Sequence, residues 1–243
     1  MKKEIIVFDK DGTLLDFDAF WVSVSVAALS DILKKLNKEE IGVDEFLTAF
    51  GVKDGVTDID GILCKGTYEQ MGLAVYDILK KYGCNETSEG IISMLIQAYN
   101  ENSDKGQIKP TCENIKEVLS ALKSDGRKLI VVTTDNYEIT EKCLEALGIS
   151  EYFECIFADD GKTPTKPDPK CILDYTEKSG IAIDKAVMVG DTMTDVNFAR
   201  NAGMSVIGVG STDTNRQRLT AHADIVINSI ADICDALKEL ETL

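Results

Sequence analysis

The sequence of 243 residues predicts an α/β fold in which a mainly parallel sheet lies between two layers of helices. Three observations favour this fold class. Short apolar runs recur along the chain, and most of them lack the alternation of a half-exposed strand. Segments with apolar residues at helical spacing separate these runs. Residues 17–105 break this rhythm with helical patterns alone, which indicates an inserted second domain.

Six apolar runs are predicted to be the strands of the sheet. They cover residues 4–8, 128–133, 154–157, 186–189, 205–209 and 224–227. Polar residues stand where several of these runs end. Asp9 and Asp11 follow the first run, Thr133 ends the second, and Gly190 and Asp191 follow the fourth.

Helices are predicted between these strands, from apolar spacing and from residues that favour helix ends. Gly148 is typical of a helix C-cap, and Asp168 followed by Pro169 is typical of a helix start, with the end expected at Gly180. The predicted helices cover residues 113–125, 136–147 and 168–180, the stretch from Asp191 to about Gly203, and about 231–240.

The insert is predicted to be helical because three apolar stripes at helical spacing run through it. A glycine-rich stretch from Gly51 to Gly66 is expected to be a loop between two of the stripes. The core domain is therefore assigned to residues 1–16 and 106–243, and the insert to residues 17–105. The stripes run from Trp21 to Leu36, from Met71 to Leu79 and from Ile91 to Ala98.

The charge balance restricts the expected partners. Aspartate and glutamate number 42 against 26 lysines and arginines, which gives a net charge of -16. Such an acidic chain repels nucleic acid and anionic membranes, so neither is expected as a partner. The chain has no apolar run long enough to cross a bilayer, and its first residues lack the features of a secretory signal. A cytoplasmic location is expected.

The cysteine and histidine content excludes several kinds of site. The seven cysteines are odd in number and show no C-x-x-C spacing, so neither a disulfide framework nor a thiolate zinc site is predicted. Reduced, mostly buried thiols are expected instead. His222 is the one histidine, which excludes a histidine metal site and most Ser-His-Asp or Cys-His mechanisms. A surface or loop position is expected for it.

Carboxylates, a hydroxyl and a lysine are predicted to meet at one edge of the sheet, because the carboxyl ends of parallel strands share that edge. These residues are Asp9, Asp11, Thr133, Asp191 and Lys166, the last in the loop after the third strand. The carboxylates in this set are hard oxygen donors, which suit Mg²⁺. One carboxylate can attack phosphorus while a cation, a lysine and a hydroxyl neutralise the phosphoryl charge. A second carboxylate can exchange protons with the leaving alkoxide and with water.

Four signatures in this sequence resemble those of the haloacid dehalogenase (HAD) superfamily of phosphohydrolases. They are D-x-D-G-T from Asp9 to Thr13, a strand ending in Thr133, Lys166 before a proline, and G-D-x-x-x-D from Gly190 to Asp195. Each signature is weak alone, but the four occur in the family's order and span the chain. The resemblance implies a Rossmann-like three-layer α/β/α core. The insert resembles the helical C1 cap of phosphoglycolate-phosphatase-like and β-phosphoglucomutase-like members, a cap that closes over the substrate.

The resemblance also implies roles for individual residues. Asp9 would be the nucleophile and Asp11 the general acid/base. A Mg²⁺ ion would be held by the Asp9 carboxylate, the Asp11 backbone carbonyl and Asp191. Asp195 would support the metal site, either from behind the direct ligands or from a position close to the ion.

The phosphoryl group would be bound by Thr133 and Lys166, and a contribution from the backbone N–H of Thr134 stays open. Lys65, in the insert, is a candidate contact for the substrate. The remaining signature residues, expected to support the site, are Gly12, Thr13 and Gly190.

The predicted function is a phosphatase for a small phosphorylated metabolite, since family members that cleave carbon–halogen or carbon–phosphorus bonds generally lack an Asp at the position of Asp11. A β-phosphoglucomutase-like mutase is the alternative. Such mutases typically carry a histidine and an arginine in the cap, and residues 17–105 contain neither. A catalytically silent binding or regulatory protein on the same fold is a third hypothesis, which the complete set of signatures disfavours. The oligomeric state, monomer or homodimer, stays open.

Overall fold

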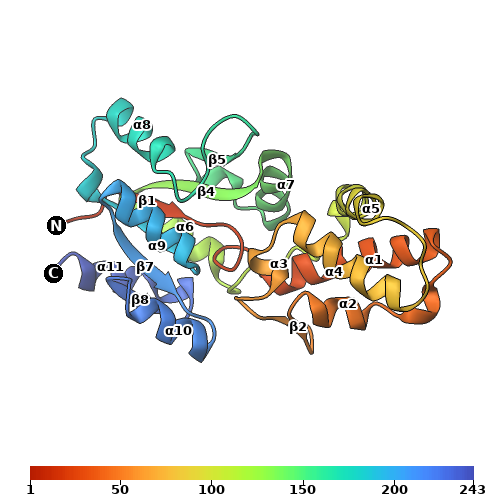
Figure 1. Cartoon of the computed structure of the whole chain (residues 1–243). Coiled ribbons are helices and arrows are strands. Elements are labelled where there is room, and N and C mark those ends of the chain that lie inside the picture. Colours follow the sequence, from red (N-terminus) through yellow and green to blue (C-terminus); the bar gives the residue numbers. More distant parts are fainter. The chain divides into compact units, whose positions relative to one another are not determined.

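A six-stranded parallel sheet forms the centre of the larger unit of the computed structural model, which describes residues 1–243 (Figure 1). All neighbouring strands pair in parallel, in the order β5-β4-β1-β6-β7-β8. The strands are β1 (Ile5–Phe8), β4 (Lys128–Asn136), β5 (Cys155–Asp159), β6 (Ala186–Gly190), β7 (Ser205–Val209) and β8 (Ile225–Ile227). The predicted α/β class is confirmed.

The strand order reverses at β1. From β1 the chain builds β4 and β5 on one side and later returns to add β6, β7 and β8 on the other. Every residue of β1 is fully buried, which explains why its sequence is apolar without alternation. In an open parallel sheet, ligands bind beyond the carboxyl ends of the strands at such a reversal. The topology therefore points to the residues that follow β1 and its neighbours.

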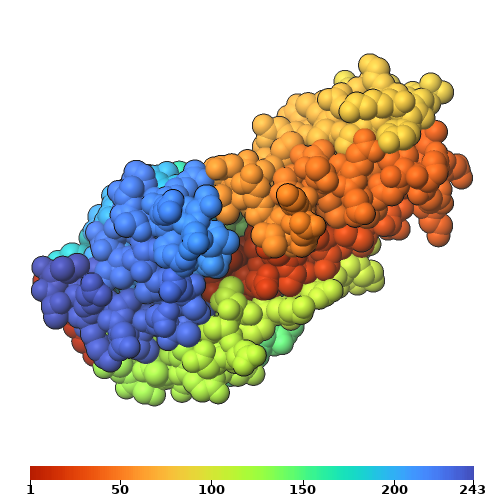
Figure 2. All heavy atoms as spheres, turned by 90° about the horizontal axis from the view of Figure 1, so that it is seen from below, coloured from red at the N-terminus to blue at the C-terminus, as the bar shows by residue number.

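Six α-helices cover this sheet. Helices α8, α9 and α10 bury apolar side chains in one cluster with Ile5 and Val7 of β1. Helix α6 packs against β4 and α11, and Figure 2 shows α6 (yellow-green) and α11 (dark blue) side by side. The helices are α6 (Ile115–Ser124), α7 (Tyr137–Leu147), α8 (Lys170–Ser179), α9 (Met193–Ala202), α10 (Asp213–Thr220) and α11 (Ile233–Leu240).

The predicted helix ends are mostly confirmed. Gly148, Gly180 and Gly203 are left-handed C-caps of α7, α8 and α9. Helix α8 starts one residue later than expected, with Pro169 as N-cap residue, while the Asp168 carboxylate accepts a hydrogen bond of 2.9 Å from the backbone N–H of Lys170. Helix α10 was not predicted.

Strand β4 is longer than predicted, because it continues past Thr133 to Asn136. Its register against β5 shifts between Val132 and Asn136, and pairing resumes where Asn136 lies opposite Asp159. Thr133 therefore lies within an irregular stretch of the strand rather than at its end. Such irregularities redirect side chains and are frequent next to functional sites.

The smaller unit comprises residues Phe17–Gln107, while Met1–Asp16 and Ile108–Leu243 form the unit with the sheet. Its main helices are α1 (Ser23–Lys35), α2 (Asp44–Ala49), α4 (Tyr68–Lys81) and α5 (Ser88–Glu101), with a π-helical turn at Asp18–Val22 and the short α3 (Ile62–Lys65). The three predicted apolar stripes coincide with the π-helical turn and α1, with α4 and with α5. Neither unit contains a helix long and apolar enough to span a membrane.

The smaller unit is not entirely helical, which corrects one expectation. Strands β2 (Val52–Lys53) and β3 (Val56–Thr57) form an antiparallel hairpin in the stretch that was predicted to be a loop. Asp54 and Gly55 connect the strands with φ of 52° and 79°. Asp-Gly with two positive φ angles is a favoured two-residue hairpin turn, so the signal was present in the sequence.

All seven cysteines are free thiols in the structure. The expectation that most are buried is wrong. Cys143 and Cys171 are buried, whereas Cys64 is exposed and the other four are half-buried. His222 is exposed, as expected.

Candidate active site

The loop after β1 brings Asp9 to the edge of the sheet where the strand order reverses. The backbone N–H of Asp9 donates to Val189 of β6 at 2.9 Å, which continues the sheet by one residue. The chain then turns back, with the N–H of Gly12 donating to the Leu15 carbonyl at 2.7 Å. Gly12 has a backbone φ of 78°, a conformation that residues other than glycine rarely adopt.

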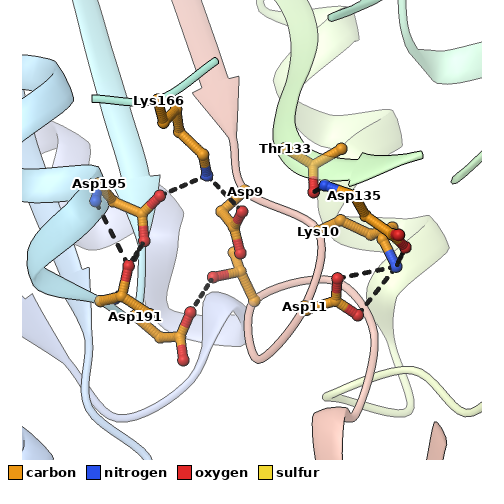
Figure 3. Close-up of polar contacts among 10 residues, drawn as sticks. Asp9, Lys10, Asp11, Thr133, Asp135, Lys166, Asp191 and Asp195 are labelled. Carbon is orange, nitrogen blue, oxygen red and sulfur yellow. Dashed lines mark hydrogen bonds and ion pairs between the residues drawn. The ribbon is translucent and has the colours of Figure 1, made fainter. Parts of the chain in front are cut away.

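Lys166 links two buried carboxylates at this edge (Figure 3). Its Nζ lies 2.5 Å from Asp9 Oδ1 and 2.6 Å from Asp195 Oδ1. All three side chains are less than a tenth exposed. The three residues come from the loop after β1, the loop before α8 and the first turn of α9, so the fold assembles them from distant parts of the chain.

Asp195 is fixed by the start of its own helix. Its Oδ2 accepts from the backbone N–H and the hydroxyl of Thr192, at 3.0 and 2.6 Å. Thr192 is the N-cap residue and the two residues form a capping box. Thr192, and not the preceding Asp191, therefore caps α9.

Asp191 follows β6 and is held by three neighbours. The Thr13 hydroxyl donates to its Oδ1 at 3.4 Å, and the Asn215 side-chain amide of α10 donates to its backbone carbonyl at 2.9 Å. Its carboxylate also lies against Gly12, where a Cβ atom would come within 2.6 Å of Asp191 Cγ. Glycine at position 12 therefore provides both the turn and the room for Asp191.

The buried carboxylates repel one another and are poorly solvated. Burial raises the pKa of Asp9 to about 7, against an opposing effect of Lys166. Burial, with the charges of Asp9 and Asp195, raises the pKa of Asp191 well above its ordinary value. Burial disfavours the charged form of Lys166, but the carboxylates of Asp195 and Asp9 outweigh burial and raise its pKa. The excess negative charge suits a cation.

Asp9, Asp191 and Asp195 offer carboxylate oxygens within 4.8 Å of one another, a spacing that one metal ion could bridge. Both oxygens of Asp195 already accept hydrogen bonds from Lys166 and Thr192. Asp9 and Asp191 are therefore better suited as direct ligands, with Asp195 behind them. Two carboxylates with space for water and a phosphate oxygen match the donor set of Mg²⁺.

Asp11 belongs to a second polar cluster beside the first (Figure 3). Its Oδ1 and Oδ2 lie 2.9 and 2.8 Å from Nζ of Lys10, and the same Nζ lies 2.8 Å from Asp135 Oδ2. The Asp11 carboxylate thus points toward Lys10 and away from Asp9. Burial disfavours the charged form of Lys10, but Asp11 and Asp135 raise its pKa.

The phosphoryl-binding candidates occupy different positions. Thr133 is buried and its Oγ1 accepts from the backbone N–H of Asp135 at 3.1 Å, whereas Thr134 is exposed. Thr133 and Lys166 both line a cavity of about 150 Å³ near the ends of β4 and β5. Lys65 lies in the other unit, where its half-exposed ammonium pairs with Asp60.

The structure thus brings Asp9, Lys166, Asp191 and Asp195 together directly. Sequence reasoning missed the partners Lys10, Asp135, Thr192 and Asn215. The T-x-x-D spacing of a capping box could have found Thr192. The only signals for two others were a lysine two residues after an apolar strand, for Lys10, and an aspartate near the end of another strand, for Asp135.

Comparisons with known proteins agree with this architecture. A protein-family model described as haloacid dehalogenase-like hydrolase matches residues 64–209 of this chain. A phosphoglycolate phosphatase of Aquifex aeolicus is 32% identical over 201 residues, which cover 82% of this chain and 81% of the relative. One from Nitrosococcus oceani is 26% identical over 246 residues, or 97% of each chain.

Solved structures show the same fold. A HAD-superfamily hydrolase, subfamily IA, from Geobacter sulfurreducens has a TM-score of 0.69 and 18% identity, with 96% of each chain covered. A protein described as a β-phosphoglucomutase from Thermotoga maritima has a TM-score of 0.64 and 20% identity, with 97% of this chain and 99% of that chain covered. At these identities the structural likeness supports the fold and does not discriminate between activities.

Proposed function

The chain belongs to the haloacid dehalogenase-like hydrolase family, and we propose that it is a Mg²⁺-dependent phosphatase that acts on a small phosphorylated metabolite. The reaction would proceed through an aspartyl-phosphate on Asp9. The observation that carries this proposal is the buried Asp9 carboxylate at the reversal point of the sheet, held 2.5 Å from Lys166 and next to Asp191. The phosphoglycolate phosphatases among its relatives support a substrate that resembles phosphoglycolate or a sugar phosphate.

Asp9 is suited to attack phosphorus because Lys166 fixes its orientation. The hydrogen bond to Lys166 engages Oδ1 of Asp9, which leaves Oδ2 for the attack. In the first step, this oxygen forms a bond to phosphorus as the bond from phosphorus to the leaving oxygen breaks. Thr133 and Lys166 would bind the phosphoryl oxygens and offset their charge.

Asp11 is proposed to be the general acid and, in the second step, the general base. It would donate one to the leaving alkoxide in the first step. In the second step it would take one from the water that attacks the aspartyl-phosphate, so that inorganic phosphate leaves and Asp9 is regenerated. The net reaction consumes one water and returns both carboxyl groups to their initial states.

Mg²⁺ fits the donor set of this site. We assign its ligands to the carboxylates of Asp9 and Asp191 and to the backbone carbonyl of Asp11. When bound, the ion offsets the negative charge of the carboxylates and of the phosphoryl group. Asp195 keeps Lys166 in place, and Gly12 and Thr13 keep Asp191 in place.

The smaller unit, Phe17–Gln107, is proposed to be a cap that selects the leaving group. Lys65, the last residue of α3, remains a candidate for substrate contact. The ion pair of Lys65 with Asp60 means that such a contact would have to compete with this aspartate.

The proposal is tested by phosphate release from a panel of phosphorylated metabolites, with Mg²⁺ and with EDTA. Asp9→Asn is compared with Asp174→Asn, a control that removes an exposed carboxylate on α8. We expect metal-dependent release from a compact group of substrates, lost in Asp9→Asn and kept in Asp174→Asn. Release that persists in Asp9→Asn would overturn the assigned nucleophile. Conversion of a sugar phosphate to an isomer without phosphate release would indicate a mutase.

A further inference from the structure

Lys10 is fully buried, and its ammonium lies between two carboxylates (Figure 3). Asp11 contacts it with both oxygens at 2.8–2.9 Å, and Asp135 with one oxygen at 2.8 Å. A buried ammonium is costly without a counter-charge. One carboxylate is enough to balance its single charge, so this pairing holds one carboxylate in excess.

The two carboxylates are held by different parts of the structure. Asp135 is fixed through its backbone, whose N–H donates to Thr133 Oγ1 at 3.1 Å, and its Oδ1 accepts from the N–H of Asn136 at 2.7 Å. Asp11 lies in the turn between β1 and the next segment, and its carboxylate is bound to Lys10 on the side away from Asp9. To give a proton to a group leaving from phosphorus at Asp9, Asp11 must take up that proton from solvent and let go of Lys10.

We propose that Asp135 is a positioning residue for the reaction, the counter-ion that stays on Lys10 while Asp11 moves to the leaving oxygen. The inference rests on the proposed function of Asp11. Asp135 lowers the cost of this movement, because the buried ammonium is never left without a carboxylate. Without Asp135, the Lys10 charge would hold Asp11 in its resting orientation.

The inference predicts a specific kinetic defect for Asp135→Asn. Attack by Asp9 on p-nitrophenyl phosphate needs no acid, since p-nitrophenolate is a good leaving group. The first-turnover burst of p-nitrophenolate should therefore stay within about threefold of wild type. Turnover of phosphoglycolate, whose alkoxide must be protonated, should fall at least tenfold, as should the steady-state rate that depends on water activation.

Two further variants separate charge compensation from simple loss of structure. Asp135→Glu keeps the charge and should restore phosphoglycolate turnover to within about threefold of wild type. Adding Lys10→Met to Asp135→Asn removes the ammonium that holds Asp11. The double variant should therefore turn over phosphoglycolate at least fivefold faster than Asp135→Asn alone, which is the reverse of additive damage.

The outcomes distinguish this inference from the proposed function. Absence of any Mg²⁺-dependent phosphate release by the wild type would overturn the function itself. If the wild type is active, equal slowing of the burst and of phosphoglycolate turnover in Asp135→Asn would overturn the role of Asp135. So would unchanged kinetics in Asp135→Asn, or a double variant slower than Asp135→Asn. Mg²⁺ titration and thermal unfolding of each variant confirm that the compared proteins are folded.

Discussion

Replacing Asp9 by Asn should stabilise the metal-free protein at neutral and alkaline pH while it abolishes turnover. Burial raises the pKa of Asp9 from 3.8 to about 7, so the folded state resists ionisation of this carboxyl group. At 1.36 kcal/mol per pH unit, the corresponding free energy is about 4 kcal/mol. The charge of Asp9 also raises the pKa of Asp191, so protonation of either carboxylate reduces the repulsion between them. We therefore expect a net gain of about 2–4 kcal/mol in the free energy of unfolding.

The pH dependence gives the sign of this effect. Between pH 3.8 and about 7 the folded protein holds the Asp9 proton more tightly than the unfolded chain does. The wild type therefore loses stability as the pH rises through this window, and the loss is complete above it. Asp9→Asn lacks this ionisation. The stability difference between variant and wild type should be small at pH 4 and largest at pH 8.

Urea unfolding in EDTA at pH 4, 5, 6, 7 and 8 measures this difference directly. Mg²⁺ at about 100 times its dissociation constant should restore about 2.7 kcal/mol to the wild type at pH 8 and much less to Asp9→Asn. A variant that is no more stable than wild type at pH 8, or one whose advantage does not grow with pH, would refute the view that Asp9 is held under electrostatic strain.

Three other substitutions test the packing of the site. Lys166→Met leaves buried carboxylates without their ammonium. It should lower the free energy of unfolding in urea at pH 8 by at least about 3 kcal/mol and the turnover rate by at least about 100-fold. Similar stability of this variant at pH 5 and pH 8 would contradict this reasoning. Gly12→Ala should lose Mg²⁺-dependent turnover, because its Cβ meets Asp191, whereas Gly180→Ala, with a similar φ of 69° and no neighbour within 4 Å, should lose only stability. Asn215→Ala should raise the Mg²⁺ concentration for half-maximal turnover about tenfold with little change in kcat, and an unchanged Mg²⁺ titration would exclude its positioning of Asp191.

The fold could be predicted wherever burial on both faces leaves a mark in the sequence. The apolar runs of β1, β6 and β7 have this mark, and their bounds agree with prediction to within a residue. Helix α10 has no such mark, since only Asn215 and Leu219 of its eight residues are buried. The hydroxyl of Thr212 at its N-cap and its packing on β7 and β8 define it instead.

The end of β4 shows a different limit. Thr134 and Asn136 are exposed and polar, so no hydrophobic pattern marks them as strand. Their extended backbone follows from the resumed pairing of Asn136 with Asp159 on a neighbouring strand. A long-range pairing of this kind is set by tertiary structure and cannot be read from local sequence.

The candidate site could be predicted in its positions but not in its contacts. Adjacent strands β1 and β6 end at the same edge, so Asp9 and Asp191 had to be neighbours once the sheet was parallel. Side-chain direction was not accessible in the same way. Asp11 was expected beside Asp9, yet its carboxylate binds Lys10, a residue whose charge gave no reason to expect full burial.

The two polar clusters of the candidate site have the same arrangement of charges. In each, a buried lysine binds a carboxylate that is proposed to react and one that is not: Lys166 binds Asp9 and Asp195, and Lys10 binds Asp11 and Asp135. If a carboxylate moved away from a lysine that had no other partner, the ammonium would be left without a counter-charge in a poorly solvated place. The second carboxylate removes that cost. The proposed movement of Asp11 can therefore proceed while Lys10 keeps a counter-ion, and Asp195 can stay bound to Lys166 during the proposed phosphorylation of Asp9.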